Sequence, residues 1–407
     1  MSANIDKASV VIIGGGIFGC SSAYHLAKGG RRDVVVIERN ELGSGATAQS
    51  AGLLLQGRSN IDVFHLVRRT LEAIVELETE LNDHIGFKRV GSLRIAATDV
   101  SAQAIRDMNA VLQKHLIAAE YMQEAEARQL VPWLDASCAR LIQYVPGDGF
   151  VDAYMLTSAY AKVARSLGVR FLQHTGVTRV LTDSGKVCAV QTDRGRIHCS
   201  WVVDAAGAWA QSVADSVGIR LPMAPVRSHY WITAPDPLFP RIHPVVVLPD
   251  ARAFTRPELG ALLLGLRELE SRTYDARKLP AKMAALQFVE PEDDMELLIE
   301  HSALLRPYMP SLDQFRFAHH ICGFSTYTPD NRFLLGPVGS IEGFLVAGGC
   351  CGSGVAISGG IGETIANLIL GRALKIDLDS FCPERCGKID VYDPAFRAQC
   401  AAARARK

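Results

Sequence analysis

The sequence predicts an α/β fold in which a Rossmann-like nucleotide-binding domain is interleaved with a second, α+β domain built on an antiparallel or mixed sheet. Apolar, β-branched runs at 8–13 and 33–37 are each long enough for a strand buried on both faces. Between them a helical pattern runs from Ile17 to Lys28 and stops at the glycine pair 29–30. Region 221–320 is rich in proline and in alternating strand patterns, which favours a separate sheet.

The rest of the chain continues with helices and short buried strands. A loop is expected over 147–152, and the last unit is a strand, a glycine-rich loop and a helix. Residues 401–407 are expected to form a frayed basic end. The expected helices are Val63–Leu81, Ala102–Ala119, Ala153–Leu167 and Ile357–Leu370, and the expected strands are Val169–Leu172, Val187–Thr192, Trp201–Ala206 and Phe344–Ala347.

Composition excludes several classes of protein. A chain of 407 residues with 48% hydrophobic and 21% charged residues suits a folded soluble protein of two interleaved domains. Its 43 basic residues balance 43 acidic ones, so no nucleic-acid partner is implied. The first apolar run, Val10–Ile13, is too short for a signal peptide or a membrane span. We therefore expect a cytoplasmic protein without a membrane span.

The ten cysteines follow no repeating frame, so no disulfide scaffold is expected. Cys350 and Cys351 are adjacent in a glycine-rich loop, and Cys382 and Cys386 flank a short turn near the C-terminus. Neither pair has the CxxC spacing and the distant second pair that are typical of zinc sites. The sequence therefore predicts no metal site.

A glycine turn follows the first predicted strand and opens the first helix. Gly14 permits the tight turn, Gly16 lets backbone amides approach a pyrophosphate at the helix N-terminus, and Gly19 lets the helix pack against the strand. Glu38 ends the second strand, where its carboxylate can accept hydrogen bonds from both adenosine ribose hydroxyls and would repel a 2′-phosphate. The turn and Glu38 together predict a bound dinucleotide with free ribose hydroxyls.

Three further segments favour FAD over NAD. Small residues fill 43–52, directly after the ribose strand, where a bulky cofactor must approach closely. Residues 201–209 supply a third strand that ends in a glycine turn. Residues 348–354 form a loop before a helix whose positive N-terminal end can stabilise negative charge on a reduced flavin. Each segment alone could be a structural turn, but together they predict FAD.

The predicted FAD-binding domain is discontinuous and consists of residues 1–88, 149–220 and 324–380. Residues 89–148 and 221–323 form the predicted substrate-binding domain, and 381–407 form a C-terminal tail. The residues expected to contact FAD are Gly14, Gly16, Ile17, Phe18, Gly19, Glu38, Arg39, Gly45, Ala46, Thr47, Gln49, Ser50, Ala51, Gly52, Val177, Ala206, Gly207, Trp209, Gly323, Gly349, Cys351, Gly352, Ser353, Gly354 and Val355.

Over nearly its whole length the sequence resembles the D-amino-acid oxidase superfamily of FAD-dependent oxidoreductases, which includes glycine and sarcosine oxidases and dimethylglycine dehydrogenase. The resemblance implies an FAD domain, a substrate sheet, and a reaction in which hydride leaves a carbon next to an amine nitrogen. The product would be an imine, which is then hydrolysed. The resemblance rests on the N-terminal turn, Ser44–Thr47, Gly149–Asp152, Val202–Gly207, Phe254–Pro257, Leu263–Gly265, Thr328–Asp330, Leu335–Gly336 and the last glycine loop with Gly362–Glu363.

Departures from the family patterns narrow the expected chemistry. The histidine that bonds covalently to FAD in dimethylglycine and sarcosine dehydrogenases corresponds to Gln49, and the cysteine that does so in monomeric sarcosine oxidases corresponds to Gly323, beside Cys322. The resemblance therefore implies noncovalent FAD. Two lysines of sarcosine oxidase correspond to Ala356 and Leu263. Because nothing obvious is left to speed electron transfer to oxygen, these losses favour a dehydrogenase.

The arginine that grips the substrate carboxylate in glycine oxidase corresponds to Ser325, so another cation must hold an amino-acid substrate. The candidates are Arg58, Arg227, Arg256, Arg267 and Arg332, each with a surface or phosphate-facing ion pair as the alternative. His229, His319 or His320 could accept the amine proton, with a structural role as the alternative, and Tyr327 could hydrogen-bond the substrate. Hydride transfer needs a neutral amine more than a strong base.

The leading hypothesis is oxidation of the C–N bond of a secondary amine or N-substituted amino acid, such as sarcosine, dimethylglycine, proline or an opine-like compound. One alternative is an oxidase that makes hydrogen peroxide from glycine or a D-amino acid. Another is a flavin subunit of a multi-subunit dehydrogenase. The expected partners are a small amine or amino acid and, as electron acceptor, oxygen or a redox carrier. A homo-oligomer and partner subunits both stay open.

Overall fold

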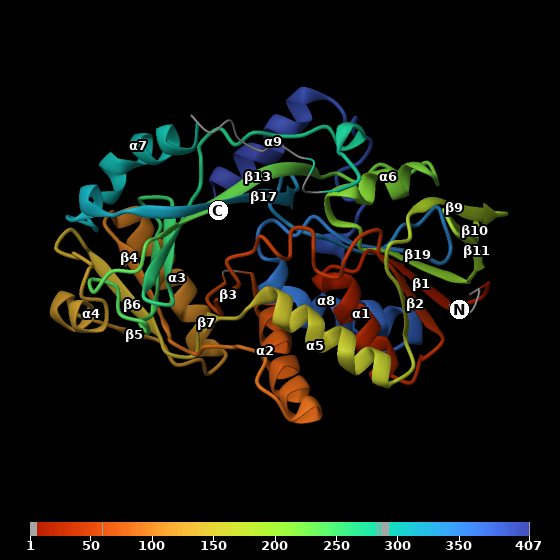
Figure 1. Ribbon diagram of the computed structural model, residues 1–407, viewed down its shortest axis with the longest axis horizontal. Coiled ribbons are helices and arrows are strands. Elements are labelled where there is room, and N and C mark those ends of the chain that lie inside the picture. Colours follow the sequence, from red (N-terminus) through yellow and green to blue (C-terminus); the bar gives the residue numbers. More distant parts are fainter. Residues whose placement is uncertain (1–5, 59, 283–284, 286–292, 407) are drawn as a thin grey trace.

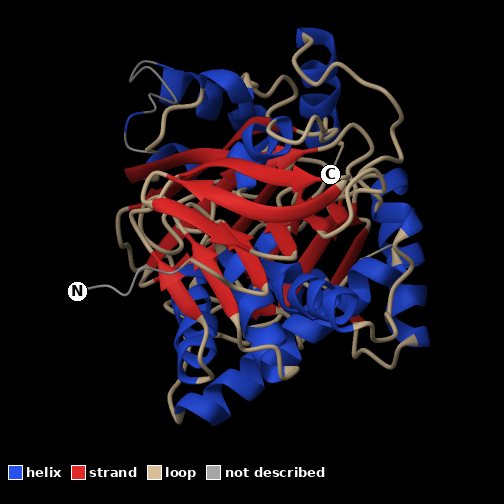
Figure 2. Cartoon of the chain, turned by 90° about the vertical axis from the view of Figure 1, so that its right-hand side faces the viewer, coloured by secondary structure: helices blue, strands red, loops and turns tan. Residues whose placement is uncertain are grey.

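Four β-sheets organise the described part of the chain, which comprises residues 6–58, 60–282, 285 and 293–406 of a computed structural model. The six-stranded sheet and the eight-stranded sheet occupy opposite ends of the long axis, at the right and left of Figure 1. Seen from the side, strands form the middle of the molecule and helices cover both sides (Figure 2). The mixed α/β architecture predicted from the sequence is confirmed.

The six-stranded sheet contains the predicted nucleotide strands. In order it comprises β18 (Leu334–Pro337), β19 (Phe344–Gly348), β12 (Trp201–Asp204), β1 (Val10–Ile13), β2 (Val34–Ile37) and β8 (Arg170–Leu172). The central strand β1 runs parallel to both of its neighbours. Val10 and Ile12 pack against the helices, whereas Val11 and Ile13 pack against the opposite layer. Burial on both faces explains the continuous apolar runs that predicted these strands.

Helices α1 and α8 pack on one face of this sheet, α2 and α5 pack against those two helices, and α1 has the predicted bounds. Helix α8 begins three residues before its predicted start. Helix α3 ends well before the predicted Ala119, because Leu116 takes a left-handed backbone angle (φ 59°) that stops the helix. The helices are α1 (Ile17–Lys28), α2 (Ile61–Leu81), α3 (Asp99–Lys114), α4 (Glu124–Leu130), α5 (Ala153–Ser166), α6 (Ala210–Asp215), α7 (Asp293–Leu305), α8 (Gly354–Leu370) and α9 (Pro394–Ala405).

The opposite face is covered by a small antiparallel sheet of β11 (Gly195–His198), β10 (Lys186–Thr192) and β9 (Val177–Asp183). A two-stranded sheet joins β3 (Leu53–Leu54) to β7 (Gly149–Phe150), within the loop predicted at 147–152. Along the chain, the three strands of the antiparallel sheet lie between β8 and β12 of the six-stranded sheet.

The eight-stranded sheet comprises β17 (Phe317–Tyr327), β13 (Ala224–Thr233), β16 (Ala261–Leu266), β15 (Ala253–Glu258), β14 (Val245–Leu248), β4 (Ser92–Ala96), β6 (Leu141–Val145) and β5 (Glu120–Tyr121). It is mixed, because β14 pairs with β4 in parallel while its other pairs are antiparallel. These strands come from both segments that were predicted to form the substrate domain. The domain boundaries themselves stay a prediction.

The C-terminal segment is ordered, so the expectation of a frayed end over 401–407 is wrong for 401–406; Lys407 lies outside the described residues. Helix α9 begins at Pro394, with the Asp393 side chain accepting a hydrogen bond from the Ala395 amide. It packs against β13 and β17 (Figure 1) and buries Phe396, Cys400 and Arg404. Asp393 followed by Pro394 is a typical helix start. The prediction of a frayed end relied on the basic composition of the tail and overlooked this signal.

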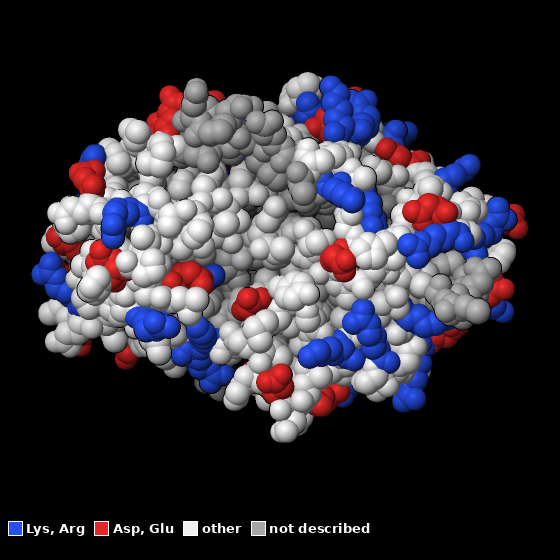
Figure 3. Space-filling view, viewed as in Figure 1, with Lys and Arg blue, Asp and Glu red and all other residues white. Residues whose placement is uncertain are grey.

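Charges on the face seen in Figure 3 are interspersed, with basic and acidic side chains around a largely uncharged centre. No helix in the described part of the chain combines the length and the apolar character needed to cross a membrane. None of the ten cysteines, all of which are described, forms a disulfide.

Substitution Gly360→Ala is expected to lower the melting temperature. A Cβ at this position of α8 would lie 2.4 Å from the Leu66 Cα of α2, so the two helices would have to separate. Such overpacking costs about 1 to 3 kcal/mol. That cost exceeds the roughly 1 kcal/mol that alanine gains over glycine in a helix. Thermal unfolding monitored by circular dichroism checks this, and an unchanged or higher melting temperature would contradict the close contact.

Candidate active site

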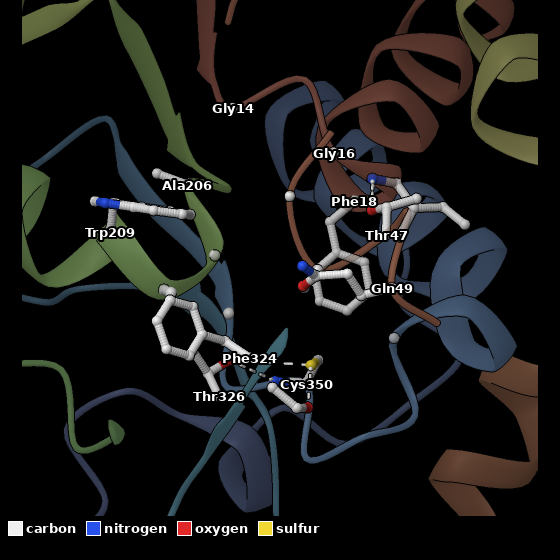
Figure 4. A pocket seen from close by; sticks show the side chains of 18 of the residues that line it. Gly14, Gly16, Phe18, Thr47, Gln49, Ala206, Trp209, Phe324, Thr326 and Cys350 are labelled. Atoms are coloured by element: carbon white, nitrogen blue, oxygen red, sulfur yellow. Dashed lines mark hydrogen bonds between the residues drawn. The ribbon is translucent and has the colours of Figure 1, made fainter. Parts of the chain in front are cut away.

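A cavity of about 790 Å³ runs between the carboxyl ends of the nucleotide strands and the long strands β13 and β17. This volume is in the range of cofactor-sized sites. Figure 4 shows it bounded by three segments: Gly14, Gly16 and Phe18 with Thr47 and Gln49; Ala206 and Trp209; and Phe324, Thr326 and Cys350. Parts of the chain that are far apart in sequence thus meet around one space.

The glycine turn brings backbone groups close together. Gly14 has φ +108°, and a Cβ there would lie 2.4 Å from the Ala205 carbonyl oxygen. A Cβ at Gly19 would lie 1.9 Å from the Gly14 carbonyl oxygen, so Gly19 serves the packing of α1 on β1 and does not line the cavity. At Gly16 a Cβ would point into open space, with only the Thr47 hydroxyl oxygen nearby at 3.5 Å. The N-terminus of α1 is therefore accessible to a pyrophosphate.

Glu38 lies at the end of β2 and faces the same cavity. Its carboxylate accepts hydrogen bonds from the Gly15 amide (2.8 Å) and the Asn40 amide (2.7 Å), one on each oxygen. Each oxygen keeps a further lone pair for a ribose hydroxyl. The Arg39 guanidinium stacks on the Trp209 ring at 4.4 Å, and burial lowers the pKa of this arginine. The residues around Glu38 therefore fit the adenosine end of FAD.

The glycine-rich loop before α8 lies at the other end of the cavity and is attached to β17. The Cys350 amide donates to the Thr326 hydroxyl (3.2 Å), and the Gly352 amide donates to the Ser325 hydroxyl (2.9 Å). Helix α8 has no side-chain cap, so its first amides stay available at the cavity. A helix N-terminus in this position suits the electron-rich edge of a flavin ring.

Gln49 and Gly323, the two positions at which the resemblance implied that a covalent flavin link is absent, lie against each other. A Cβ at Gly323 would be 1.8 Å from the Gln49 side-chain oxygen, so the glutamine occupies the space that a larger residue on β17 would need. A carboxamide and a glycine offer no nucleophile, so neither residue can form a covalent bond to the flavin.

The part of the cavity that faces β13, β16 and α9 carries the candidate substrate residues. Burial and the nearby Arg94 lower the pKa of Arg58 to about 10, and burial also lowers that of Arg267 to about 10. Burial raises the pKa of Tyr327 to about 12, so its phenol stays protonated. Burial, reinforced by Arg404 and Arg227, lowers the pKa of His229 to about 2, so its imidazole is neutral.

Comparison with known proteins decides the family. Residues 9–368 match the family model described as FAD dependent oxidoreductase. The chain belongs to this family. The FAD cofactor and the fold class predicted from the sequence are thereby confirmed.

Two curated relatives and one solved structure show the range of this oxidoreductase family. Mitochondrial dimethylglycine dehydrogenase of Rattus norvegicus is 30% identical over 94% of the chain and 45% of the relative. Glycine oxidase of Geobacillus kaustophilus is 27% identical over 95% of the chain and 99% of the relative. The crystal structure of L-proline dehydrogenase from P. horikoshii has a TM-score of 0.83 at 26% identity, covering 94% of the chain and 98% of that chain. The chain thus spans less than half the length of the dimethylglycine dehydrogenase.

The oxidoreductase chain brings most of the predicted FAD contacts to the cavity. The predicted residues that line it are Gly14, Gly16, Ile17, Phe18, Glu38, Arg39, Gly45, Ala46, Thr47, Gln49, Ser50, Ala51, Gly52, Val177, Ala206, Gly207, Trp209, Gly352, Ser353, Gly354 and Val355, together with Arg58, Arg267, His229 and Tyr327. Gly19, Gly323, Gly349 and Cys351 do not line it. Gly349 and Cys351 have left-handed backbone angles (φ +57° and +46°), so they shape the turn of the loop that other residues use to line the cavity.

Five other candidate residues do not line the cavity, so the prediction that they bind or act on the substrate is corrected. Arg227 forms a buried ion pair with Glu268. Arg256 pairs with Glu258 and donates to the Ala51 carbonyl (2.8 Å). Arg332 is exposed. His320 stacks on Trp231 with ring centroids 4.6 Å apart, and His319, named as an alternative base, is exposed.

Arg404 is one of several cavity residues that sequence reasoning missed; other cations among them are Arg179, Arg277 and Lys282. Arg404 lies on α9, is 3% exposed and lines the cavity. Phe396, Cys400 and Arg404 recur at a spacing of four residues, which is a helical signal in the tail. The spacing could have revealed a helix, but the direction of the Arg404 side chain follows only from tertiary packing.

Substitution Asp204→Asn is expected to flatten the dependence of stability on pH. Asp204 is fully buried at the end of β12, and burial raises its pKa from 3.8 to about 8. Folding favours the neutral carboxyl, so its stabilising contribution is complete below pH 3.8 and is lost as the pH rises to about 8. Melting temperatures across this window should fall more steeply in the wild type than in the variant. Parallel curves would argue against a titrating Asp204.

Proposed function

We propose that the chain oxidises the C–N bond of a secondary amine or N-substituted amino acid, with noncovalent FAD as the hydride acceptor. The observation that carries this proposal is Arg58, a half-buried arginine that lines the cavity of the dinucleotide turn, forms no ion pair with any described residue, and has a buried Nε without a hydrogen-bond partner among the described residues. Leaving such a donor unsatisfied is costly, so the site favours an anionic ligand such as a substrate carboxylate. The similarity to dimethylglycine dehydrogenase, glycine oxidase and L-proline dehydrogenase supports amine chemistry.

The residues of the chain would bind and orient the substrate. Arg58 holds the carboxylate, and the protonated Tyr327 phenol donates a hydrogen bond. Neutral His229 is too weak a base to take the ammonium proton, so the substrate would release that proton to water on binding, and the imidazole would accept a hydrogen bond from the N–H of the neutral amine that hydride loss requires. Leu55, Leu266 and Phe254 line the same space and exclude water. Bound FAD supplies the hydride acceptor, and the resulting imine is hydrolysed in water.

We further propose a dehydrogenase that works in the cytoplasm. The resemblance places the lysine that assists reaction with oxygen in sarcosine oxidase at Leu263, a fully buried residue of β16, so no cation can act from there. A further lysine of sarcosine oxidase, in the last glycine loop, corresponds to Ala356 in α8. A redox carrier or a partner subunit is therefore favoured over oxygen as the electron acceptor. Rapid reoxidation of the reduced flavin by air would instead favour the peroxide-forming alternative.

Anaerobic bleaching of the flavin absorbance tests the proposed reaction. The FAD-loaded protein is mixed with sarcosine, dimethylglycine, proline, glycine, D-amino acids or opine-like compounds, and secondary or N-substituted amines are expected to reduce the flavin fastest. A 2-hydroxy acid serves as the negative control. Reduction by the 2-hydroxy acid but by none of the amines would overturn the proposal.

A further inference from the structure

Three arginines from separate parts of the chain line the substrate end of the cavity. Arg58 precedes α2, Arg267 follows β16, and Arg404 lies in the last turn of α9. The family match ends at residue 368, so Arg404 belongs to a segment outside it. Arg404 therefore reaches the cavity from beyond the segment that defines the family match.

Arg404 is held rigidly. Its Nη1 donates to the Ser271 hydroxyl (2.8 Å) and its Nη2 donates to the Leu266 carbonyl (2.9 Å). The Glu268 carboxylate lies 3.7 Å from Nη1. A guanidinium has five N–H donors, so donors remain for a ligand in the cavity. Because the side chain is already ordered, binding an anion there costs little conformational entropy.

Positive charge exceeds negative charge around this end of the cavity. Glu268 is shared between Arg404 and Arg227, which pairs with it more closely. The buried Asp148 is the carboxylate whose charge acts on both Arg58 and Arg94. These four arginines thus face two carboxylates among the described residues. The only carboxylate among the described residues that line the cavity is Glu38, which belongs to the adenosine end.

The surplus charge is divided between two positions. Arg404 lies against the end of β16, where its Nη2 donates to the Leu266 carbonyl, whereas Arg58 follows Gly57, whose carbonyl accepts a hydrogen bond from Arg94 Nη2 (3.3 Å). Two separated guanidinium groups can hold two carboxylates of one ligand, whereas a single carboxylate would leave the remaining donors of one of them without a ligand.

We propose that Arg404 is a specificity-determining residue that binds a second carboxylate of the substrate. The preferred substrate is then a secondary amine that carries two carboxylates, one held at Arg58 and the other at Arg404. This inference rests on the proposed amine oxidation and names its substrate class.

Inert ether analogues test the second carboxylate without turnover. In methoxyacetate and oxydiacetate an ether oxygen replaces the amine nitrogen, so neither can be oxidised like the amine, and they carry one and two carboxylates respectively. Oxydipropionate, with methoxypropionate as its partner, covers a longer spacing. Dissociation constants are measured on the FAD-loaded protein from the change in flavin absorbance. At least one dicarboxylate is expected to bind about 10-fold to 100-fold more tightly than its monocarboxylate partner. Equal or weaker binding of both dicarboxylates would overturn the inference.

Variants on α9 assign this preference to one residue. Arg404→Gln should abolish the preference while the affinity for the monocarboxylate changes by less than about 2-fold, and Arg404→Lys should retain part of it. Arg406→Gln, an exposed arginine on the same helix end, should behave like the wild type. A folded, flavin-loaded Arg404→Gln protein that kept the preference would refute the role of Arg404. If this variant does not fold, an Arg404→Lys protein with the full preference and unchanged dicarboxylate affinity would refute it.

The two proposals can fail separately. If sarcosine or proline reduces the flavin but no dicarboxylate preference exists, the second-carboxylate site is rejected and amine oxidation stands. If no amine reduces the flavin, amine oxidation is rejected, and with it the substrate class inferred from Arg404, even where oxydiacetate binds tightly.

Discussion

Replacing Gly16 by leucine is expected to give a folded protein that does not retain FAD. The backbone of Gly16 has φ −73° and ψ −176°, which any residue adopts, and its Cβ direction meets no protein atom closer than the Thr47 hydroxyl oxygen at 3.5 Å. The leucine side chain would instead fill the space where a pyrophosphate reaches the amides of α1. Flavin absorbance and circular dichroism of the purified protein measure the two effects.

Gly14→Ala is the matched comparison for this prediction. Its Cβ would lie 2.4 Å from a backbone oxygen at φ +108°, so this variant should lose thermal stability as well as flavin. If Gly16→Leu kept stoichiometric FAD, the dinucleotide would have to bind elsewhere in the cavity.

Arg58→Gln is expected to raise KM for the amine substrate strongly while the protein keeps its flavin. Losing one partner of a desolvated charged contact costs about 2 to 5 kcal/mol, which corresponds to roughly 30-fold to several thousand-fold in binding. Because Arg58 would hold the carboxylate and not the reacting carbon, kcat at saturation should fall less than kcat/KM. Anaerobic rapid-mixing kinetics of flavin reduction, measured over a range of substrate concentrations, separate the two parameters.

Arg332→Gln is the control for this measurement, because Arg332 was an equal candidate by sequence and is exposed outside the cavity. Its KM should stay within about 2-fold of the wild type, as is usual for exposed charges. Similar losses in both variants would show that Arg58 has no special role at the substrate.

Local patterns predicted the nucleotide half of the site well. The turn from Gly14 to Gly19, the acidic end of β2 and the loop before α8 each combine a residue type with a position at the end of a strand. Parallel strands place their carboxyl ends at one edge of the sheet, so residues that follow different strands had to meet there. Each of these residues is required for a local reason: a backbone angle at Gly14, a close backbone approach at Gly19, or a carboxylate beside a ribose at Glu38.

The substrate half could not be predicted in the same way. The sequence offered five equivalent arginines as candidates. In the structure Arg227 pairs with Glu268, Arg256 pairs with Glu258, and Arg332 is exposed. Only the two remaining candidates, Arg58 and Arg267, line the cavity. Arg227 and Glu268 lie 41 positions apart, so their ion pair leaves no periodic trace in the sequence.

By itself the sequence predicted an α/β fold and a dinucleotide with free ribose hydroxyls, which follow from glycine angles, strand burial and the chemistry of single side chains. A flavin held without a covalent bond was what the family resemblance implied at Gln49 and Gly323. Only the tertiary structure decided which cations line the cavity. It seats α9 on β13 and β17 and so brings Arg404, from the far end of the chain, into the cavity of Gly14. An unpaired charge is costly only where it is buried. Burial is set by three-dimensional packing, so the neighbours of an arginine in the sequence do not reveal which group it pairs with.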